Sequence, residues 1–89
     1  MKMQLRAPPF DSQIRVLKAV ADQIITAQIQ TALIQHKSMQ HAFIHVETLA
    51  GGVELTGWVS KAAQKQLAVA LAADIRGVSY VVNNLSVRN

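Results

Sequence analysis

Hydrophobic and polar residues alternate between residues 43 and 59, which is the period of a β-strand with one buried face. The pattern forms two runs, separated by Ala50-Gly51-Gly52. Glycine enters the positive-φ conformations of tight turns without the clash that a Cβ would cause. The apolar positions that share one face are Ile44, Val46, Val53, Leu55 and Val59. This stretch therefore predicts a β-hairpin.

Upstream, from Asp11 to about Lys37, the apolar spacing changes to three and four, which predicts a helix capped by Asp11 or Ser12. The residues expected on its apolar side are Leu17, Val20, Ile24 or Ile25, Ile29, Ala32 and Leu33. A helix of this length would extend over roughly 40 Å, too far for so small a domain to cover. Either its first part projects, or it breaks near Asp22, which could cap a second segment. Residues 1–10 contain a Pro-Pro pair and are expected to be a flexible lead-in.

A second helix is predicted over residues 61–76, with Ser60 as its N-cap and Gly77 as the left-handed residue that ends it. Its apolar stripe would contain Leu67, Ala68, Leu71, Ala72 and Ile75. Residues 79–87 alternate again and predict a third strand, with Val81, Leu85 and Val87 on one face.

The order of elements is helix, strand, strand, helix, strand. Because each element has one apolar face, these faces bury each other best in an α+β fold, αββαβ, with both helices packed on one face of a three-stranded sheet. The pattern leaves open which hairpin strand lies beside the third strand.

The other face of this sheet has no third layer to cover it. Alternation places on it the residues Phe43, His45, Thr56, Trp58, Tyr80 and Val82. An exposed apolar surface of this kind usually marks an interface. We expect a contact with a protein partner or a second copy there, unless the N-terminal segment or edge residues cover it.

Composition narrows the class of protein. The 51% apolar and 4% aromatic content of the 89 residues predicts one domain with an aliphatic core. The net charge of +4 favours an anionic partner, such as phospholipid, nucleic acid or an acidic protein. The basic residues are scattered, so a polybasic tail is excluded.

Candidate catalytic chemistry is sparse. There is no cysteine, and His36, His41 and His45 match no metal-ligand spacing. The carboxylates are dispersed, and no serine lies in a nucleophile motif. No phosphate-binding glycine motif and no Gly-x-x-Gly loop of an RNA-binding KH domain occurs. We expect no enzymatic activity, no metal and no cofactor, and nucleic acid is a weak candidate.

The start of the second predicted helix is a candidate anion-binding site, formed by Ser60, Lys61 and Lys65. Free backbone N–H groups and the positive end of the helix dipole favour an anion there. Two lysines one turn apart oppose that dipole until a negative group arrives. A lipid phosphate or an acidic protein surface would supply that group.

The chain resembles the BON domain, a bacterial domain named for osmotically induced and nodulation proteins. The resemblance covers residues 22–89 and leaves 1–21 as a lead-in, flexible and then helical. The residues that carry it most specifically are Gly52, Leu55, Gly57, Gly77, Val78, Val81, Asn83 and Leu85.

The resemblance implies the αββαβ fold and a non-enzymatic role in phospholipid attachment or in the assembly of envelope proteins. Members of the family are often exported and commonly have two copies of the domain or a partner domain, whereas this sequence shows one copy and no secretory signal. As written, it is expected to be soluble and cytoplasmic, or envelope-associated if it is a trimmed fragment. We expect a binding module for anionic phospholipid or for a protein partner. The alternative is a homo-oligomerising structural module without lipid affinity.

Overall fold

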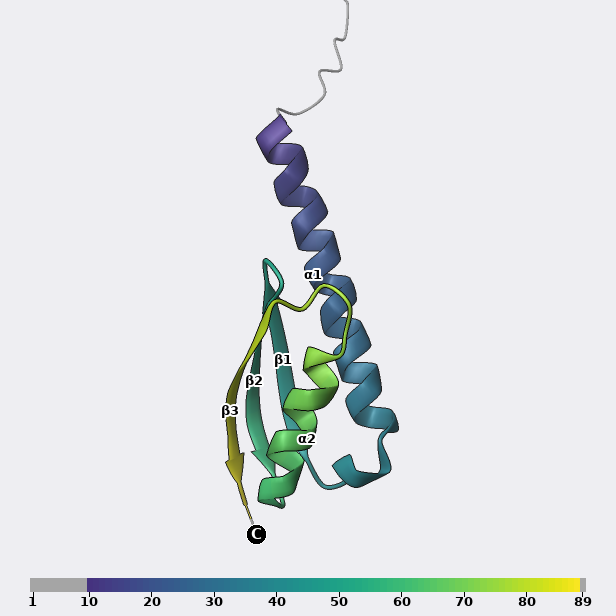
Figure 1. Cartoon of the computed structure of the whole chain (residues 1–89), viewed down its shortest axis with the longest axis vertical. Helices are drawn as coiled ribbons and strands as arrows, with labels where there is room; N and C mark the ends of the chain where they lie inside the picture. Colours follow the sequence, from purple (N-terminus) through teal and green to yellow (C-terminus); the bar gives the residue numbers. More distant parts are fainter. Residues whose placement is uncertain (1–9, 89) are drawn as a thin grey trace, which may run out of the picture.

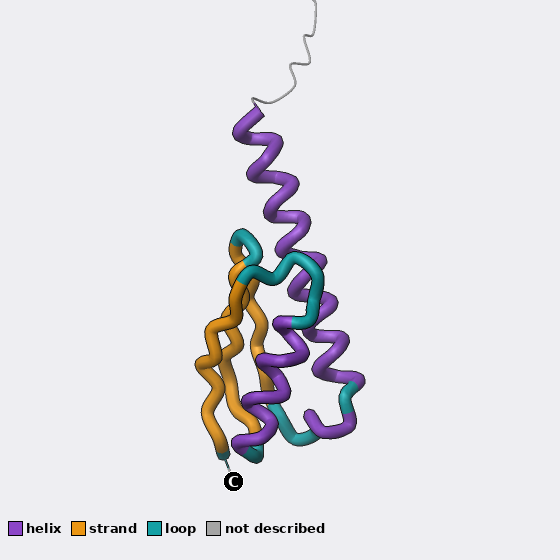
Figure 2. The backbone as a smooth tube through the Cα atoms, in the orientation of Figure 1, coloured by secondary structure: helices purple, strands orange, loops and turns teal. Residues whose placement is uncertain are grey.

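The structure is a computed structural model that describes residues 10–88, with side chains described from Ile14 onward. The predicted flexible lead-in over residues 1–10 therefore lies almost wholly outside the described residues. The elements in chain order are α1 (Phe10–Gln35), the short 3-10 helix η1 (Lys37–Met39), β1 (Phe43–Leu49), β2 (Gly52–Val59), α2 (Ala62–Ala73) and β3 (Tyr80–Val87). This confirms the αββαβ fold, and both long helices lie on one side of the sheet (Figure 1, Figure 2).

The three strands are ordered β1-β2-β3, with β1 antiparallel and β3 parallel to β2. The question of strand order is therefore settled: the third strand lies beside the second strand of the hairpin. Helix α1 packs chiefly on β1, and α2 packs chiefly on β3. The C-terminal end of β3 returns to the same end of the sheet as the start of α2 (Figure 1).

The predicted hairpin is confirmed, and its turn has an unusual backbone. Leu49 pairs with Gly52, which leaves Ala50 and Gly51 as a two-residue turn with φ of 49° and 84°. Positive φ at both positions is the requirement of a type I′ hairpin turn. The carboxylate of Asp22 on α1 holds this turn by accepting hydrogen bonds from the N–H groups of Ala50 and Gly51, at 2.8 and 3.1 Å.

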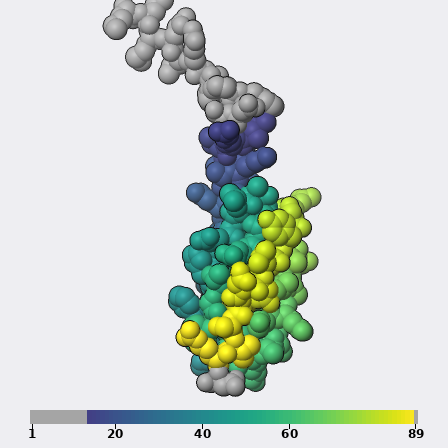
Figure 3. Space-filling model, turned by 90° about the vertical axis from the view of Figure 1, so that its left-hand side faces the viewer, coloured from purple at the N-terminus to yellow at the C-terminus, as the bar shows by residue number. Residues whose placement is uncertain are grey.

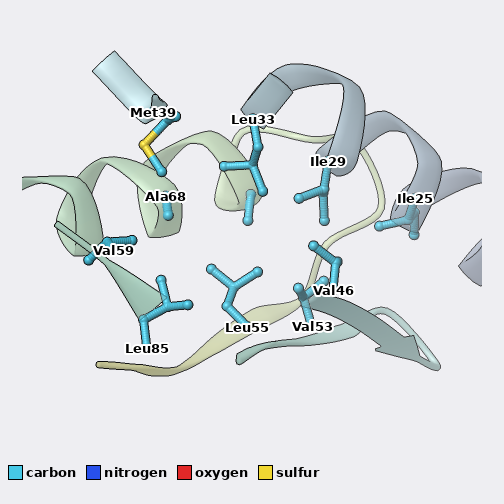
Figure 4. Packing of buried hydrophobic residues seen from close by; sticks show 11 residues of the cluster. Ile25, Ile29, Leu33, Met39, Val46, Val53, Leu55, Val59, Ala68 and Leu85 are labelled. Atoms are coloured by element: carbon cyan, nitrogen blue, oxygen red, sulfur yellow. The ribbon is translucent and has the colours of Figure 1, made fainter. Parts of the chain in front are cut away.

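The core between helices and sheet is aliphatic, as expected from the composition. Figure 4 shows side chains of α1, η1 and α2 pointing at those of the strands. The buried apolar residues are Ile25, Ile29, Leu33, Met39, Val46, Val53, Leu55, Val59, Ala68, Ala72 and Leu85. The small side chains of Ala68 and Ala72, both fully buried, let α2 approach the sheet closely.

Helix α1 is unbroken, so its first part projects beyond the sheet (Figure 1). Asp22 caps no second segment, because its carboxylate is bonded to the hairpin turn. The prediction of a single apolar side on this helix is wrong. The core contains Ile25, Ile29 and Leu33, whereas the exposed apolar residues of α1 include Leu17, Val20 and Ile24. At 3.6 residues per turn these are two rows on roughly opposite sides of the helix.

Both predicted ends of α2 need correction. Its N-cap is Lys61, and the Ser60 hydroxyl instead donates a hydrogen bond to the His41 carbonyl at 2.9 Å. Ser60 is thus occupied in joining two loops. At the other end the helix stops at Ala73, and Gly77, with φ of 96°, supports a later turn in the loop. Gly77 is left-handed as predicted, but it does not end the helix.

Candidate functional site

The start of α2 is organised by a buried glutamine. Gln64 is 8% exposed, and its side-chain oxygen accepts hydrogen bonds from the N–H groups of Ser60 and Lys61, at 2.7 and 3.0 Å. Its amide nitrogen donates to the carbonyls of Ser38 and Gln40, at 2.8 and 3.1 Å. All four hydrogen-bonding positions of the amide are used. The start of α2 is therefore tied to the loop that follows α1.

This connection brings basic residues from separate elements to one end of the molecule. Lys37, His41, Ser60 and Lys61 line one surface hollow together with Ser38, Gln40 and Gln64. Lys65 lies one turn further along α2. The predicted residues Ser60, Lys61 and Lys65 are thus neighbours, and the structure adds Lys37 and His41 to them. The hydroxyl of Ser60 is already bonded to a carbonyl, so the lysines are the groups left for an anion.

The last described residue adds a cation at the same end of the domain. The Arg88 N–H donates a hydrogen bond to the Val59 carbonyl at 2.7 Å, which fixes Arg88 beside the end of β2. Its guanidinium lies 5.8 Å from the centre of the Trp58 ring, within cation–π range. We define the basic end as Lys37, His41, Lys61, Lys65 and Arg88.

Acidic side chains lie away from the basic end. Among the described side chains, Asp22 is bonded to the hairpin turn, and Asp74 is at the far end of α2. Glu47 and Glu54 face each other across the ladder in the half of the sheet nearer the turn. Arg15, Lys18 and Arg76 are also outside the basic end. Among the described side chains, the lysines and the arginine of the basic end therefore have no acidic neighbour.

The outer sheet face is the face without helices. It contains the residues that the sequence placed there, since the register pairs Phe43 with Trp58, His45 with Thr56, and Tyr80 with Gly52. Figure 3 looks onto this face, and no helix lies in front of the strands. The exposed fractions are 64% for Phe43, 62% for Tyr80 and 41% for Val82, while Trp58 is half-buried. The proposed role of this face as a contact surface stays a prediction.

The outer sheet face is not uniformly apolar. Glu47 and Glu54 oppose each other at its middle, where like charges directly across a ladder repel. His45 lies 3.1 Å from the Glu47 carboxylate, and Asn84 donates to that of Glu54 at 3.1 Å. These acids separate Tyr80, near the turn, from the pair Phe43 and Trp58 beside the basic end. Aromatic rings and a cation occur together at the end of the face away from the turn, where Phe43, Trp58 and Arg88 lie.

The three histidines do not converge. The His36 ring accepts a hydrogen bond from the Ser38 N–H, His45 is on the outer sheet face, and His41 lines the hollow at the start of α2. Over residues 10–88 no group of three potential metal ligands is found. Within the same range no helix has both the length and the apolar character to cross a bilayer.

Sequence reasoning missed several residues of this region. Gln64 has the spacing of a capping-box residue relative to Lys61, but its bonds to Ser38 and Gln40 depend on the tertiary fold. Lys37 and Arg88 join Lys61 only once the loop after α1 and the end of β3 are in place. No local pattern in the sequence identifies them.

Together, the fold and these surfaces define a small α+β binding or structural module. The family model of the BON domain matches residues 21–89, and the chain belongs to this family. Over 68 residues it is 37% identical to the osmotically-inducible protein Y of Escherichia coli K12. The matched segment covers 76% of this chain and 34% of that protein. Membership points to a non-enzymatic role.

A solved structure shows the same fold at lower identity. It is the C-terminal domain of CdsD, the structural protein of the type III secretion system of Chlamydia trachomatis. The TM-score is 0.64 at 21% identity, over 76% of this chain and 34% of that one. The chain thus spans about a third of the length of each of these two proteins.

Proposed function

We propose that the chain is a peripheral binding module that attaches to anionic phospholipid surfaces through its basic end. The observation that carries this proposal is that Lys37, Lys61, Lys65 and Arg88 lie at one end of the domain, the end at which Phe43 is exposed and Trp58 is half-buried. Cations near a bilayer surface contribute about 1 kcal/mol each when the lipids are anionic. Aromatic rings favour the boundary between headgroups and acyl chains.

The geometry suits a surface better than a small soluble ligand. Lys37 and Lys61, which line the hollow at the start of α2, are both exposed, so that an extended surface can reach them. An acidic protein could use the same cations. The lipid surface is favoured because Phe43 and Trp58 lie at the edge of the cationic cluster, where they could enter the headgroup layer.

The proposal extends to the location of the chain in the cell and to the conditions under which it acts. Attachment to phospholipid would place the chain at the cell envelope. The 37% identity to a protein named as osmotically inducible supports a role under osmotic stress.

The test is co-sedimentation with vesicles of phosphatidylcholine containing about one third phosphatidylglycerol, at low and high salt. The variant is Lys61→Glu combined with Lys65→Glu. We expect wild-type binding that weakens with salt and a loss of at least about tenfold in the variant, since two favourable charges become unfavourable. Glutamates at the start of α2 suit the helix dipole, so the variant should fold.

The matched control is Arg15→Glu combined with Lys18→Glu, which makes the same change in net charge on the projecting part of α1. The proposal requires the control to bind several-fold better than the Lys61 and Lys65 variant. Equal losses would show attraction by net charge alone. Absence of wild-type vesicle binding would contradict the lipid proposal and favour a protein partner.

A further inference from the structure

The solvent side of α1 has a regular, mostly apolar row that its own domain leaves exposed. The row, here called the α1 seam, consists of Leu17, Val20, Ile24, Ala27, Thr31 and Ile34. Its steps are three, four, three, four and three residues, which is the a and d spacing of a coiled coil. All six residues are exposed, with exposed fractions of 68% at Leu17, 53% at Ile24 and 83% at Ile34.

Most of the seam points away from the sheet, and Ala27 and Ile34 lie nearest to it, in hollows shared with residues of β1. The core row of α1 is Ile25, Ile29 and Leu33, which is on roughly the opposite side of the helix. An ordinary surface helix has charged residues on the side that faces water. Here the charged residues between positions 16 and 35 are Lys18 and Asp22, and both lie on the core side of the helix by the same 3.6-residue geometry.

Uncharged side chains flank the seam. The residues at the neighbouring e and g positions are Val16, Ala21, Gln23, Gln28, Gln30 and Gln35. In coiled coils these positions decide which partners are attracted or repelled through their charges. A seam with glutamine flanks presents nothing that repels an identical seam.

We propose that the α1 seam is the contact surface for a second copy of this chain, which packs its own α1 against it. A heptad row is self-complementary, as the isologous interface of a twofold dimer requires. Because the core row is on roughly the opposite side of the helix, each domain lies mainly behind its own α1, which leaves the seam accessible to a second helix. The interface would also give the projecting turns of α1 the packing that their own domain does not provide.

A hollow beside the α1 seam has the shape that a second helix could fill. A shallow hollow is lined by Ala27, Gln28, Thr31, Ala32 and Gln35. The small side chains of Ala27 and Thr31 leave space where an apolar side chain of the partner helix can insert, as a knob enters a hole. The long glutamines beside the seam add contact area, which a stable interface needs in amounts near 800 Å² per partner.

A bilayer is a less suitable occupant. Helices that lie in a membrane interface have a wide apolar face bordered by lysine and arginine. The α1 seam is narrow, includes Ala27 and Thr31, and has no cation at its borders. This inference is independent of the proposed lipid attachment, because the basic end is on other elements and remains free in such a dimer.

The test is the molar mass of the full chain by sedimentation equilibrium between about 1 µM and 1 mM, the range in which moderate dimer affinities appear. We expect the mass to rise from 9.7 kDa toward twice that value. Ile24→Glu should raise the dissociation constant at least about a hundredfold, because a twofold dimer buries the introduced charge twice. Ala19→Glu, an exposed change on α1 outside the seam, is the matched control and should leave the constant within about threefold.

A gain of affinity provides the second readout. Thr31→Ile puts a larger β-branched residue at an a position, which favours two-stranded coiled coils, and should lower the dissociation constant. A mass of 9.7 kDa for the wild type at the highest concentration would overturn the inference. So would a dimer that Tyr80→Glu dissociates and Ile24→Glu does not, since that result would assign the contact to the outer sheet face. Because Ile24 is 53% exposed, thermal melting of the isolated variant should be close to that of the wild-type monomer.

Discussion

The substitution Gln64→Glu sets a general rule of helix capping against the particular contacts of this fold. Glutamate at the third position of a helix satisfies a capping box and the helix dipole, worth about 0.3–1 kcal/mol in favour of the variant. In this structure, however, the amide nitrogen of Gln64 donates to the carbonyls of Ser38 and Gln40 at 2.8 and 3.1 Å. A carboxylate would lose both donors and direct an anion at two carbonyl oxygens.

The lost hydrogen bonds outweigh the gain from the helix dipole, so Gln64→Glu should destabilise the fold. Each lost hydrogen bond is worth about 1 kcal/mol net, and the second carboxylate oxygen, buried at position 64 without a donor, costs about 1–3 kcal/mol more. After the dipole gain is subtracted, Gln64→Glu should lower the free energy of unfolding by about 2–4 kcal/mol. For a domain of this size the melting temperature should then fall by at least about 10 °C.

The assay is urea or thermal unfolding followed by circular dichroism at neutral pH. The matched control is Gln66→Glu, the same chemical change on an exposed residue of α2, which should alter stability by less than about 0.5 kcal/mol. Near pH 3 the deficit of the Gln64→Glu variant should shrink, because a protonated carboxyl can again donate one hydrogen bond. Unchanged or higher stability of that variant at neutral pH would refute this account of how the start of α2 is held.

Three further predictions concern the hairpin. Asp22→Ala should cost about 2–3 kcal/mol in urea unfolding, because the N–H groups of Ala50 and Gly51 lose a charged acceptor; a loss below about 0.5 kcal/mol would contradict that role. Ala50→Gly should raise stability by about 0.5–1 kcal/mol, because φ of 49° disfavours a residue with a Cβ, and a lower urea midpoint would oppose this. Gly57→Ala should cost more than about 3 kcal/mol, since φ is 116° and a Cβ would overlap the Phe43 carbonyl; soluble expression with a normal melting curve would argue against it.

The fold could be predicted because its signals are local. The alternation on either side of the turn identified the hairpin and assigned Val46 and Leu55 to the core and Trp58 and Tyr80 to the outer face. A period of two leaves no other choice once one face is buried. The relation of β3 to β2 depends on long-range packing by α2, and the sequence pattern contains no equivalent signal for it.

Helix α1 shows where periodicity fails. Spacings of three and four fit both the core row and the α1 seam, and Ile24 and Ile25 are adjacent members of the two rows. The sequence pattern therefore merges them into one stripe. The buried row is the one that faces the sheet in the assembled fold, and the sequence pattern alone does not identify that side of the helix.

The candidate site was predictable only in part for a related reason. Lys61 and Lys65 could be found because one short segment contains both. Lys37 and Arg88 come to the same end of the domain through the η1 loop and the return of β3. Ser60 was misassigned as the N-cap because its hydroxyl has a tertiary partner, the His41 carbonyl.

The projecting part of α1 gives a single helix two very different tertiary environments. The turns around Ile29 are held by the core, whereas the turns around Leu17 have only their own backbone hydrogen bonds. Amide hydrogen exchange should therefore be slow near the sheet and become steadily faster toward the projecting end, because opening there breaks no core contact. The exchange rate of each amide along α1 thus reports how readily that turn opens. Binding of a partner to the projecting turns should slow exchange at the residues that it covers.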